Sequence, residues 1–410
     1  MKNWRNHRRM RMTKMGSSMK TSILSVLVGL GFVGCMSTSP DIELREYPRP
    51  GALSSTLTDG PHLIYDGDTT VFLRGVNVEG QMLLDVKKFS RSELQTIIVH
   101  KSGFLPRSFE VELAEAPIKE ATYYPPAEKI FAVSDIEGNF NTLVNLMQQH
   151  GVINEHLDWS FGSGHFVMIG DVFDRGNHVT EMLWLLYHLE AQALENGGYV
   201  HLLMGNHEAL NLRGDLRYIE PKYTTFSKLT EELLGINYVS LFSNDSELGR
   251  WLRSKNVVEK IGNKLFVHAG ISPDLMRTGY SLEEINELSK EMLDTPKADF
   301  TGSDSLMWGK MGPFWYRGYF DVNRKSWGPK ASQLDVDQIV DQFEFSQIIV
   351  GHSHVDKPEL LYEGRVCAIN VVPPADHLIS APPWRAYGVL IQGDDYFIAD
   401  EDGLLTDIME

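Results

Sequence analysis

From residue 130 onwards, short apolar runs alternate with longer stretches of mixed character. The short runs hold four or five consecutive apolar residues, as in KIFAVSD, HFVMIGD and VHLLMGNHE. Runs of this length, bounded by glycine or polar residues, are typical of strands buried on both faces. The longer stretches, such as TEMLWLLYHLEAQALENGG, carry apolar residues at steps of three and four, as amphipathic helices do. The alternation predicts an α/β domain over residues 121–410, with helices covering its sheets.

The segment before this domain follows a different pattern. Between residues 53 and 120, short runs of alternating apolar and polar side chains are separated by turn sequences such as Asp66-Gly67-Asp68. This pattern predicts β-hairpins, and we expect a small all-β, sandwich-like domain over 53–120. Its sequence holds no recognisable catalytic group of residues. We interpret it as a spacer or a docking module, whose partner the sequence leaves unknown.

The N-terminus has the charge pattern of an export signal. Residues 1–20 carry seven Lys or Arg residues and no acid, and an apolar run from Ile23 to Val33 follows. That run is too short for a membrane-spanning helix, which takes about 20 residues, and fits the core of a signal peptide. FVGC, which ends at Cys35, resembles the lipobox of bacterial lipoproteins. We therefore expect a lipoprotein signal peptide over 1–34, lipidation at Cys35 and a tether over 35–52.

These features predict a protein anchored by lipid to the membrane surface of the bacterial cell envelope. Met36 stands where an aspartate is associated with retention in the inner membrane, so the prediction is the periplasmic face of the outer membrane. The alternative is a plain secretory signal with an incidental cysteine. The sequence leaves the start of translation open between Met1, Met15 and Met19.

Composition narrows the range of partners. Hydrophobic residues make up 42% of the chain and charged residues 23%, which is ordinary for a globular protein. The net charge of −17 argues against nucleic acid as a partner, because a phosphate backbone calls for a basic face. Of the two cysteines, acylation of Cys35 would exclude an intrachain disulfide. Cys367 lies in the apolar sequence RVCAINVV, and we expect it to be a core residue rather than a nucleophile.

Polar residues of metal-ligand type end five of the predicted strands. They are Asp135, Asp171, the pair Asn206 and His207, His268, and the pair His352 and His354. One such residue at a strand end usually makes a local hydrogen bond, but five strand ends of this kind indicate a shared site at one edge of the sheets. Oxygen and imidazole ligands without cysteine suit Mn, Fe or Zn. Residues 213–258 interrupt the alternation with polar, mostly helical sequence, which we expect to form a cap beside this site.

The five motifs SDIEGN, GDVFDRG, GNHE, VHAGISPD and GHSHV resemble those of the calcineurin-like metallophosphoesterases. GDVFDRG followed by GNHE is most similar to the phosphoprotein phosphatases, and the bacterial Shewanella-like protein phosphatases resemble the chain most. The resemblance covers about residues 129–370. It implies an α/β fold of the metallophosphoesterase type, with a two-sheet β-sandwich flanked by helices.

The resemblance also implies roles for the motif residues. Asp135 and His354 would bind a first metal ion, Asp171 would bridge both ions, and the second ion would be held by Asn206, His268 and His352. His207 would be the general acid, oriented by Asp174, and Arg175 would bind the substrate phosphate. Arg317 in FWYRGY is a second phosphate-binding candidate, with a surface arginine beside aromatic residues as the alternative. The implied reaction is hydrolysis of a phosphomonoester by a metal-bridging hydroxide.

The first motif departs from the family pattern. Where Asp-x-His-Gly is usual, this chain has Asp135-Ile136-Glu137-Gly138. Because carboxylate oxygen suits hard divalent ions, we expect Glu137 to be a ligand of the first metal, with Mn favoured over Fe or Zn. The competing hypothesis is a weakened or empty first site.

We expect an active phosphatase, with a phosphorylated protein or a small phosphoester as substrate. Protein substrates are implied only by the resemblance. A nucleotide or dinucleotide phosphohydrolase of the same superfamily would share all the metal ligands, and a non-catalytic binding lipoprotein is the alternative from a different class.

Overall fold

A computed structural model describes residues 58–103, 105–371 and 385–409. The predicted signal peptide, Cys35 and the predicted tether lie outside the described residues. The described residues belong to one compact unit. Within the described ranges, no helix has the length and apolar character needed to cross a membrane.

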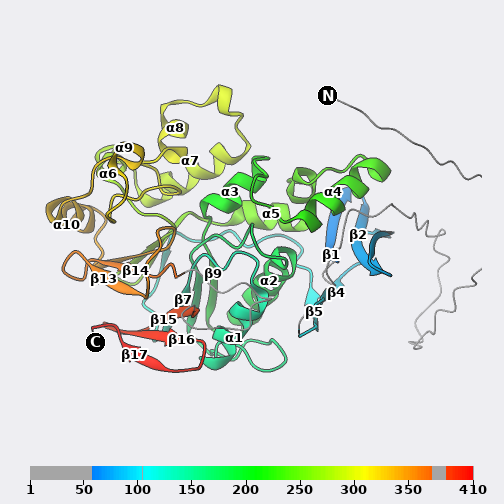
Figure 1. The fold of residues 1–410 in the computed structure, drawn as a ribbon, viewed down its shortest axis with the longest axis horizontal. Helices are drawn as coiled ribbons and strands as arrows, with labels where there is room; N and C mark the ends of the chain where they lie inside the picture. The colour runs from blue at the N-terminus through cyan, green and yellow to red at the C-terminus, as the bar shows by residue number, and fades with distance from the viewer. Residues whose placement is uncertain (1–57, 104, 372–384, 410) are drawn as a thin grey trace, which may run out of the picture. The chain divides into compact units, whose positions relative to one another are not determined.

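Two six-stranded sheets form the centre of the α/β part (Figure 1). In the first sheet the strand order is β17 (Leu405–Asp407), β16 (Asp395–Asp400), β15 (Tyr387–Gln392), β7 (Ile130–Val133), β8 (His165–Met168), β9 (Tyr199–Leu202). In the second sheet the order is β13 (Glu359–Leu361), β14 (Val366–Ala368), β12 (Gln347–Val350), β11 (Lys264–Val267), β10 (Val258–Ile261), β6 (Tyr123–Tyr124). This confirms the predicted two-sheet α/β fold.

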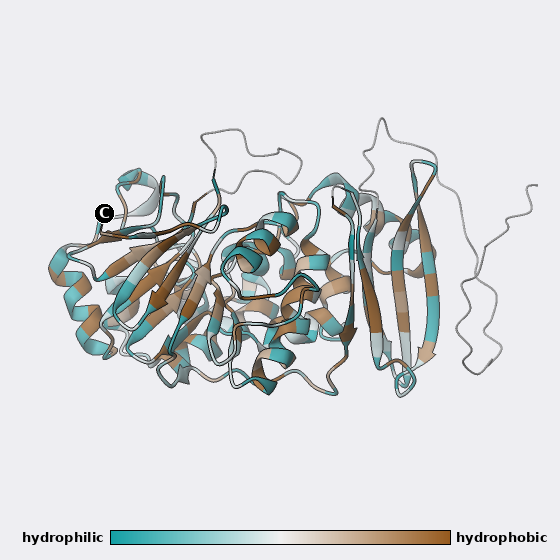
Figure 2. Ribbon diagram, turned by 90° about the horizontal axis from the view of Figure 1, so that it is seen from below, coloured by the Kyte–Doolittle hydropathy of each residue, from teal (hydrophilic) through white to brown (hydrophobic). Residues whose placement is uncertain are grey.

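The inner faces of the two sheets share a hydrophobic core. Ile130 and Val167 from the first sheet pack in one cluster with Phe266, Ile349 and Cys367 from the second. The strands of this sandwich are strongly hydrophobic in Figure 2. Cys367 is fully buried, as predicted, and burial raises the pKa of its thiol to about 12. Because a thiol with so high a pKa stays protonated near neutral pH, Cys367 is an inert core residue.

Helices cover the outer faces of the sheets and fill the segments between the strands. On the first sheet, α2 (Val179–Glu195) contacts both β9 and α1 (Phe140–Gln149). The remaining helices after β9 are α3 (Asn206–Leu212), α4 (Pro221–Leu234), η1 (Val239–Phe242), α5 (Glu247–Ser254), α6 (Pro273–Arg277), α7 (Leu282–Asp294), η2 (Lys297–Asp299), α8 (Gly302–Trp308), α9 (Arg324–Trp327) and α10 (Gln333–Gln342). Most residues of α2 are buried, because sheet, helix and N-terminal strands surround it.

The N-terminal all-β region is present and consists of two small sheets. The strands β1 (Asp59–Asp66), β2 (Thr69–Val78) and β3 (Gln81–Ser90) form one antiparallel sheet, and β4 (Thr96–Lys101) pairs with β5 (Arg107–Glu112). Leu63, Leu73 and Val99 belong to the same hydrophobic cluster as Trp184 of α2. The N-terminal strands therefore share their core with the α/β part.

Polar contacts tie this all-β region to α2. The Thr180 hydroxyl donates to Asp59 over 2.8 Å, and the Trp184 indole N–H donates to the Pro61 carbonyl over 2.8 Å. All of these side chains are buried, so their hydrogen bonds are protected from water.

The stretch 213–258 contains α4, η1 and α5 and is mostly helical. In this stretch α4 contacts β1 and β3, and α5 contacts β1. These helices thus pack on the N-terminal strands. Tyr218, in the loop before α4, is the part of this stretch that lies against the strand-end residues described next.

Candidate active site

The ligand-type residues lie in tight turns after β7, β8, β11 and β12 and at the start of α3. Left-handed backbone angles occur at Asp135 (φ 51°), Glu137 (φ 48°), Asp171 (φ 56°) and His352 (φ 60°). Non-glycine residues rarely adopt this conformation, and its clustering is typical of functional sites. Gly205 is required where it stands, because a Cβ there would collide with the carboxylate of Asp171.

Asp171, His268 and His352 bring three possible metal-donor atoms together within 4.8 Å of one another. The His268 Nδ1–H donates to the Ile169 carbonyl over 2.8 Å, which turns Nε2 toward Asp171, 3.2 Å away. The amide oxygen of Asn206 lies 2.9 Å from the same Nε2. A backbone carbonyl that fixes one ring nitrogen while the other faces the donors is the usual support of a metal-bound histidine.

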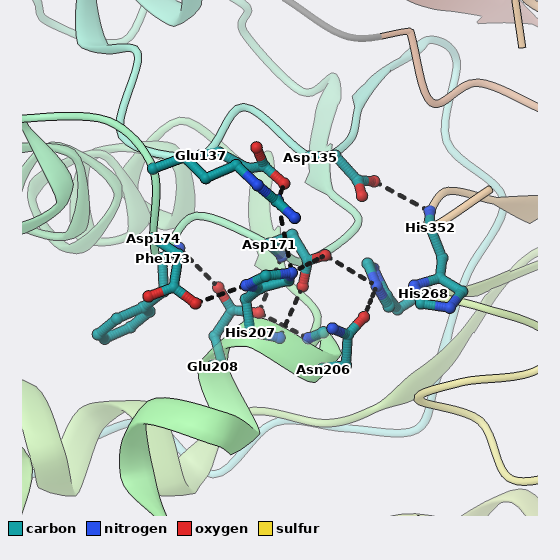
Figure 3. A network of polar contacts seen from close by, with 12 residues as sticks. Asp135, Glu137, Asp171, Phe173, Asp174, Asn206, His207, Glu208, His268 and His352 are labelled. Atoms are coloured by element: carbon teal, nitrogen blue, oxygen red, sulfur yellow. Dashed lines mark hydrogen bonds and ion pairs between the residues drawn. The ribbon is translucent and has the colours of Figure 1, made fainter. Parts of the chain in front are cut away.

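A second donor group overlaps the first. Glu137, Asp171 and His207 also offer atoms within 4.8 Å of one another, so Asp171 belongs to both groups. Figure 3 shows these side chains, with Asp135, directed toward a common space. Asp135 accepts from the His352 backbone N–H over 3.0 Å. The structure thus brings together six of the seven predicted metal ligands, the exception being His354.

The charges at this site are poorly balanced. Burial and repulsion from Asp171 raise the pKa of Asp135 to about 7. Burial lowers the pKa of His268, but the charge of Asp171 outweighs it and raises that pKa to about 9. The buried Nε2 of His352 has no hydrogen-bond partner among the described residues. Buried carboxylates and an unpartnered imidazole nitrogen suit divalent cations. Such ions would neutralise the charge of the carboxylates and would be coordinated by the imidazole nitrogen.

His207 is held by a carboxylate at its far side. Its Nδ1–H donates to Asp174 Oδ2 over 2.5 Å, and Asn211 donates to the other oxygen of Asp174 over 2.9 Å. Burial lowers the pKa of His207, but the charges of Asp171 and Asp174 raise it above its usual value. The arrangement leaves Nε2 on the side of the donor groups and favours the protonated ring.

Two arginines border the site. Arg175, whose side chain is 50% exposed, forms an ion pair with Glu137. Arg317 donates to the His352 carbonyl and to the Ser353 hydroxyl, both over 3.2 Å, and its guanidinium lies 4.9 Å from the centre of the Trp327 ring. Arg317 is thus attached to the strand-end loop of His352, beside the donor groups, rather than lying free on the surface. His354 is exposed and belongs to neither donor group, although the charges of Arg317 and Arg175 reach it.

Two contributions to the site were not predicted from the sequence. Asn211 supports Asp174 and lies four residues after His207 on α3, a spacing that places both on one helix face and could have indicated the contact. Tyr218 packs its ring 5.2 Å from that of His207 and 5.4 Å from the Arg175 guanidinium, and it is 41% exposed. No sequence pattern marks Tyr218, because only tertiary folding brings its loop to the site.

Glu208, next to His207, has a structural role. Its carboxylate accepts from the backbone N–H groups of Gly205, Asp171, Val172 and Phe173. It therefore fixes the turn that carries Asp171.

Comparison with known proteins agrees with this geometry. The sequence profile of the calcineurin-like phosphoesterases matches residues 128–356, more than half of the chain. The crystal structure of a cold-active protein-tyrosine phosphatase from a psychrophilic Shewanella species is similar, with a TM-score of 0.71 and 30% identity over 86% of this chain and 99% of that one.

The curated relatives match a smaller share of the chain than this structure does. An uncharacterized protein of Schizosaccharomyces pombe is 29% identical over 251 residues, covering 58% of this chain and 69% of the relative. Shewanella-like protein phosphatase 1 of Plasmodium berghei is 26% identical over 237 residues, covering 55% of this chain and 61% of that protein. These matches confirm the resemblance inferred from the five motifs.

Proposed function

The chain belongs to the calcineurin-like phosphoesterase family, and we propose that it is a phosphatase that hydrolyses phosphomonoesters of proteins with two divalent cations. The phosphoesterase class rests on the family. Protein substrates are inferred from the named relatives, and the number of cations and the roles of individual residues are inferred from the site.

The observation that carries the proposal is the double membership of Asp171. Its carboxylate belongs to one donor group with His268 and His352, and it also lies with Glu137 in a second group, whose third member, His207, we assign to proton transfer rather than to metal binding. A carboxylate has two oxygens and can bind a cation with each, so a residue in this position suits a two-metal centre.

The residues present fit such a centre. Asn206, His268 and His352 would hold the second cation with Asp171, and Asp135 and Glu137 would hold the first. His354, which is exposed beside the two arginines, remains a candidate nitrogen donor for the first cation. The carboxylate-rich first site favours Mn, with Fe or Zn as alternatives. When bound, such ions polarise phosphoryl oxygens and make water a nucleophile at neutral pH.

We infer that His207 protonates the leaving oxygen from Nε2. Asp174 and Asn211 hold the ring, and the neighbouring carboxylates keep it protonated. A general acid in this position lowers the barrier because an alkoxide or phenolate leaves poorly without a proton. Asp174 is a positioning residue, since it acts through His207.

Arg175 and Arg317 would bind the phosphoryl oxygens. A guanidinium presents two parallel N–H groups to an anion, and both side chains lie within reach of the charge of Asp135. Glu137 pairs with Arg175 in the structure, so the substrate phosphate would take the place of Glu137 as the partner of this arginine. The named activity of the Shewanella relative supports a phosphorylated protein as the substrate.

The test is a phosphatase assay of the chain from Met36 supplied with Mn, with phosphopeptides and nucleotides as competing substrates. We expect phosphopeptide hydrolysis that depends on added metal. His207→Asn should abolish turnover and leave bound metal, counted by elemental analysis, unchanged; Asn263→Ala, in the β10–β11 turn, is the control. Preference for nucleotides would replace the protein-phosphatase proposal, and a wild type that binds metal without turnover would favour a non-catalytic binding lipoprotein.

We also propose that Cys35 anchors the protein to the periplasmic face of the outer membrane. The support is the short apolar run that ends at this cysteine. Metabolic labelling with a fatty acid should mark the wild type and not Cys35→Ala. Labelling of neither protein would leave the plain secretory signal as the explanation.

A further inference from the structure

A cavity of about 420 Å³ lies at the seam between the two small sheets of the N-terminal region, apart from the metal-donor groups. Its walls come from β1, β2, β4 and β5, with Ser102 and Pro106 between the last two strands. A cavity of this size is large enough for a small ligand. No residue of the proposed active site lines it.

The lining is basic, although the whole chain carries a net charge of −17. Arg74, Lys101 and Arg107 contribute three permanent positive charges, and His100 adds an imidazole. Asp59 is the one acid of the lining, and it is already bound by the ring of His62 at 3.1 Å and by a threonine hydroxyl. Arg74 likewise pairs with Asp85 outside the lining, at 2.9 Å, so the basic character of the cavity rests mainly on Lys101 and Arg107.

The two arginines of the lining differ in their partners. Arg74 donates through one terminal nitrogen to Asp85 over 2.9 Å, but its buried Nε–H has no partner in the described part of the chain. Arg107 forms no ion pair with any described residue and lies beside Lys101 in the β4–β5 register. Arg107 is therefore the arginine whose guanidinium donors remain for a ligand in the cavity.

The walls also hold the elements that lead into the active site. The Lys101 ammonium donates to Asn141 over 3.0 Å, at the start of α1, directly after the loop of Asp135 and Glu137. Asp59 accepts from Thr180 over 2.8 Å, at the start of α2, which follows the loop of Asp171. A ligand in the cavity would thus contact Lys101 and Asp59, whose hydrogen bonds hold the helices that follow the two metal-donor loops.

We propose that this cavity binds a phosphoryl group, from inorganic phosphate or from a small organic phosphate, with Arg74 and Arg107 as the main donors. Two guanidinium groups from different strands line the cavity, beside the hydroxyls of Ser102 and Ser108, which bond Thr58 and His100; together these groups suit an anion with more than two acceptor oxygens. A dianionic group with three terminal oxygens matches this set.

His100 supplies a local reporter. Its Nδ1 lies 2.7 Å from the Ser108 hydroxyl, inside the lining, and Arg74 is the charge that acts on it most directly. The experiment follows the His100 ring resonances in the Zn-loaded protein during titration with inorganic phosphate, phenylphosphonate, acetate or chloride at constant ionic strength. Loss of the signal in His100→Gln assigns it.

We expect a saturable shift with phosphate and phenylphosphonate, and neither acetate nor chloride should reproduce it. Arg107→Gln should weaken phosphate binding about tenfold, the size expected for one charge-assisted contact. Lys88→Gln removes the same charge from an exposed position on β3, outside the lining, and should leave the affinity unchanged. A shift with phosphate alone identifies the inorganic ion, and a shift with both identifies the phosphoryl group in general.

Equal shifts with chloride, no shift at all, or an Arg107→Gln affinity equal to that of the wild type would overturn the proposal. The reporter does not depend on turnover. An active enzyme with a silent His100 therefore refutes only the cavity, and a responsive His100 in a chain without phosphatase activity refutes only the proposed function.

Discussion

Two groups of buried charges in this protein are built on opposite principles. At the active site, Asp135 and Asp171 are buried close to each other without a matching permanent cation between them. Near β10, the fully buried Lys255 ammonium is matched, because it donates to Glu120 over 2.5 Å and to Glu190 over 2.6 Å. The first group lacks a cation among the described residues, whereas in the second the ammonium has its carboxylate partners within the protein. Unmatched burial, rather than burial itself, distinguishes the functional cluster.

Of the changes considered, removal of the Asp171 carboxylate, which both donor groups share, should have the largest effect on phosphatase activity. Asp171→Asn keeps the shape but removes the charge common to both donor groups. We expect phosphatase activity to fall by about a thousandfold or more, because metal ions supply several kcal/mol of transition-state stabilisation. Steady-state kinetics with a phosphopeptide checks this. Activity within tenfold of the wild type would show that Asp171 is not shared by two cations.

The matched group should respond in stability instead. Lys255→Met leaves Glu120 and Glu190 buried without their cation, and breaking a buried pair in this way costs about 3–5 kcal/mol. Urea unfolding measures the change, and bound metal per folded chain should stay the same. Equal stability of the variant and the wild type would show that the two carboxylates are neutral or solvated, so the contrast would fail.

Position 137 tests whether the unmatched charges hold metal. Glu137→Ala removes one oxygen donor and should weaken binding of Mn by about 10- to 100-fold, the range seen when the support of a metal site is removed. Glu137→His restores a donor and should be tolerated, with a shift in preference away from Mn. Isothermal titration with Mn and Zn measures both. If Glu137→Ala binds Mn with the affinity of the wild type, Glu137 is not a metal ligand and only pairs with Arg175.

The smallest effect is expected at the rim. Tyr218→Ala removes the ring that contacts His207 and the Arg175 guanidinium, and cation–π contacts at exposed sites contribute about 0.5–1 kcal/mol. We expect kcat/KM to fall two- to fivefold, with recovery in Tyr218→Phe. A loss in both variants would instead indicate that the hydroxyl is required.

More of the active site than of the surrounding fold can be predicted from the sequence. Short buried strands can be recognised from their composition, and the residues at their carboxyl ends come together because parallel strands end at the same edge of the sheets. Asp135, Asp171, Asn206, His268 and His352 could therefore be placed from the motifs. His354 is exposed and lies outside both donor groups, so its assignment to the first cation stays a prediction.

No local sequence pattern predicts the contacts between segments that are far apart along the chain. Nothing around Asp59 or Thr180 indicates that they pair across more than a hundred residues, and the alternating pattern of 53–120 describes strands without describing what covers them. The position of Tyr218 beside His207 could not be predicted for the same reason. Local patterns predict local elements, and the partners of an element depend on the rest of the chain.

The hydrogen bond of the Trp184 indole to Pro61 limits how far the protein can be shortened from its N-terminus. A polypeptide that starts at residue 128, where the family match begins, would lack Pro61 and Asp59, which accept hydrogen bonds from Trp184 and Thr180. It would also expose the apolar side of α2 that Leu63 and Leu73 cover. The shortest segment that carries the catalytic motifs is therefore expected to be insoluble by itself, and expression should begin no later than β1.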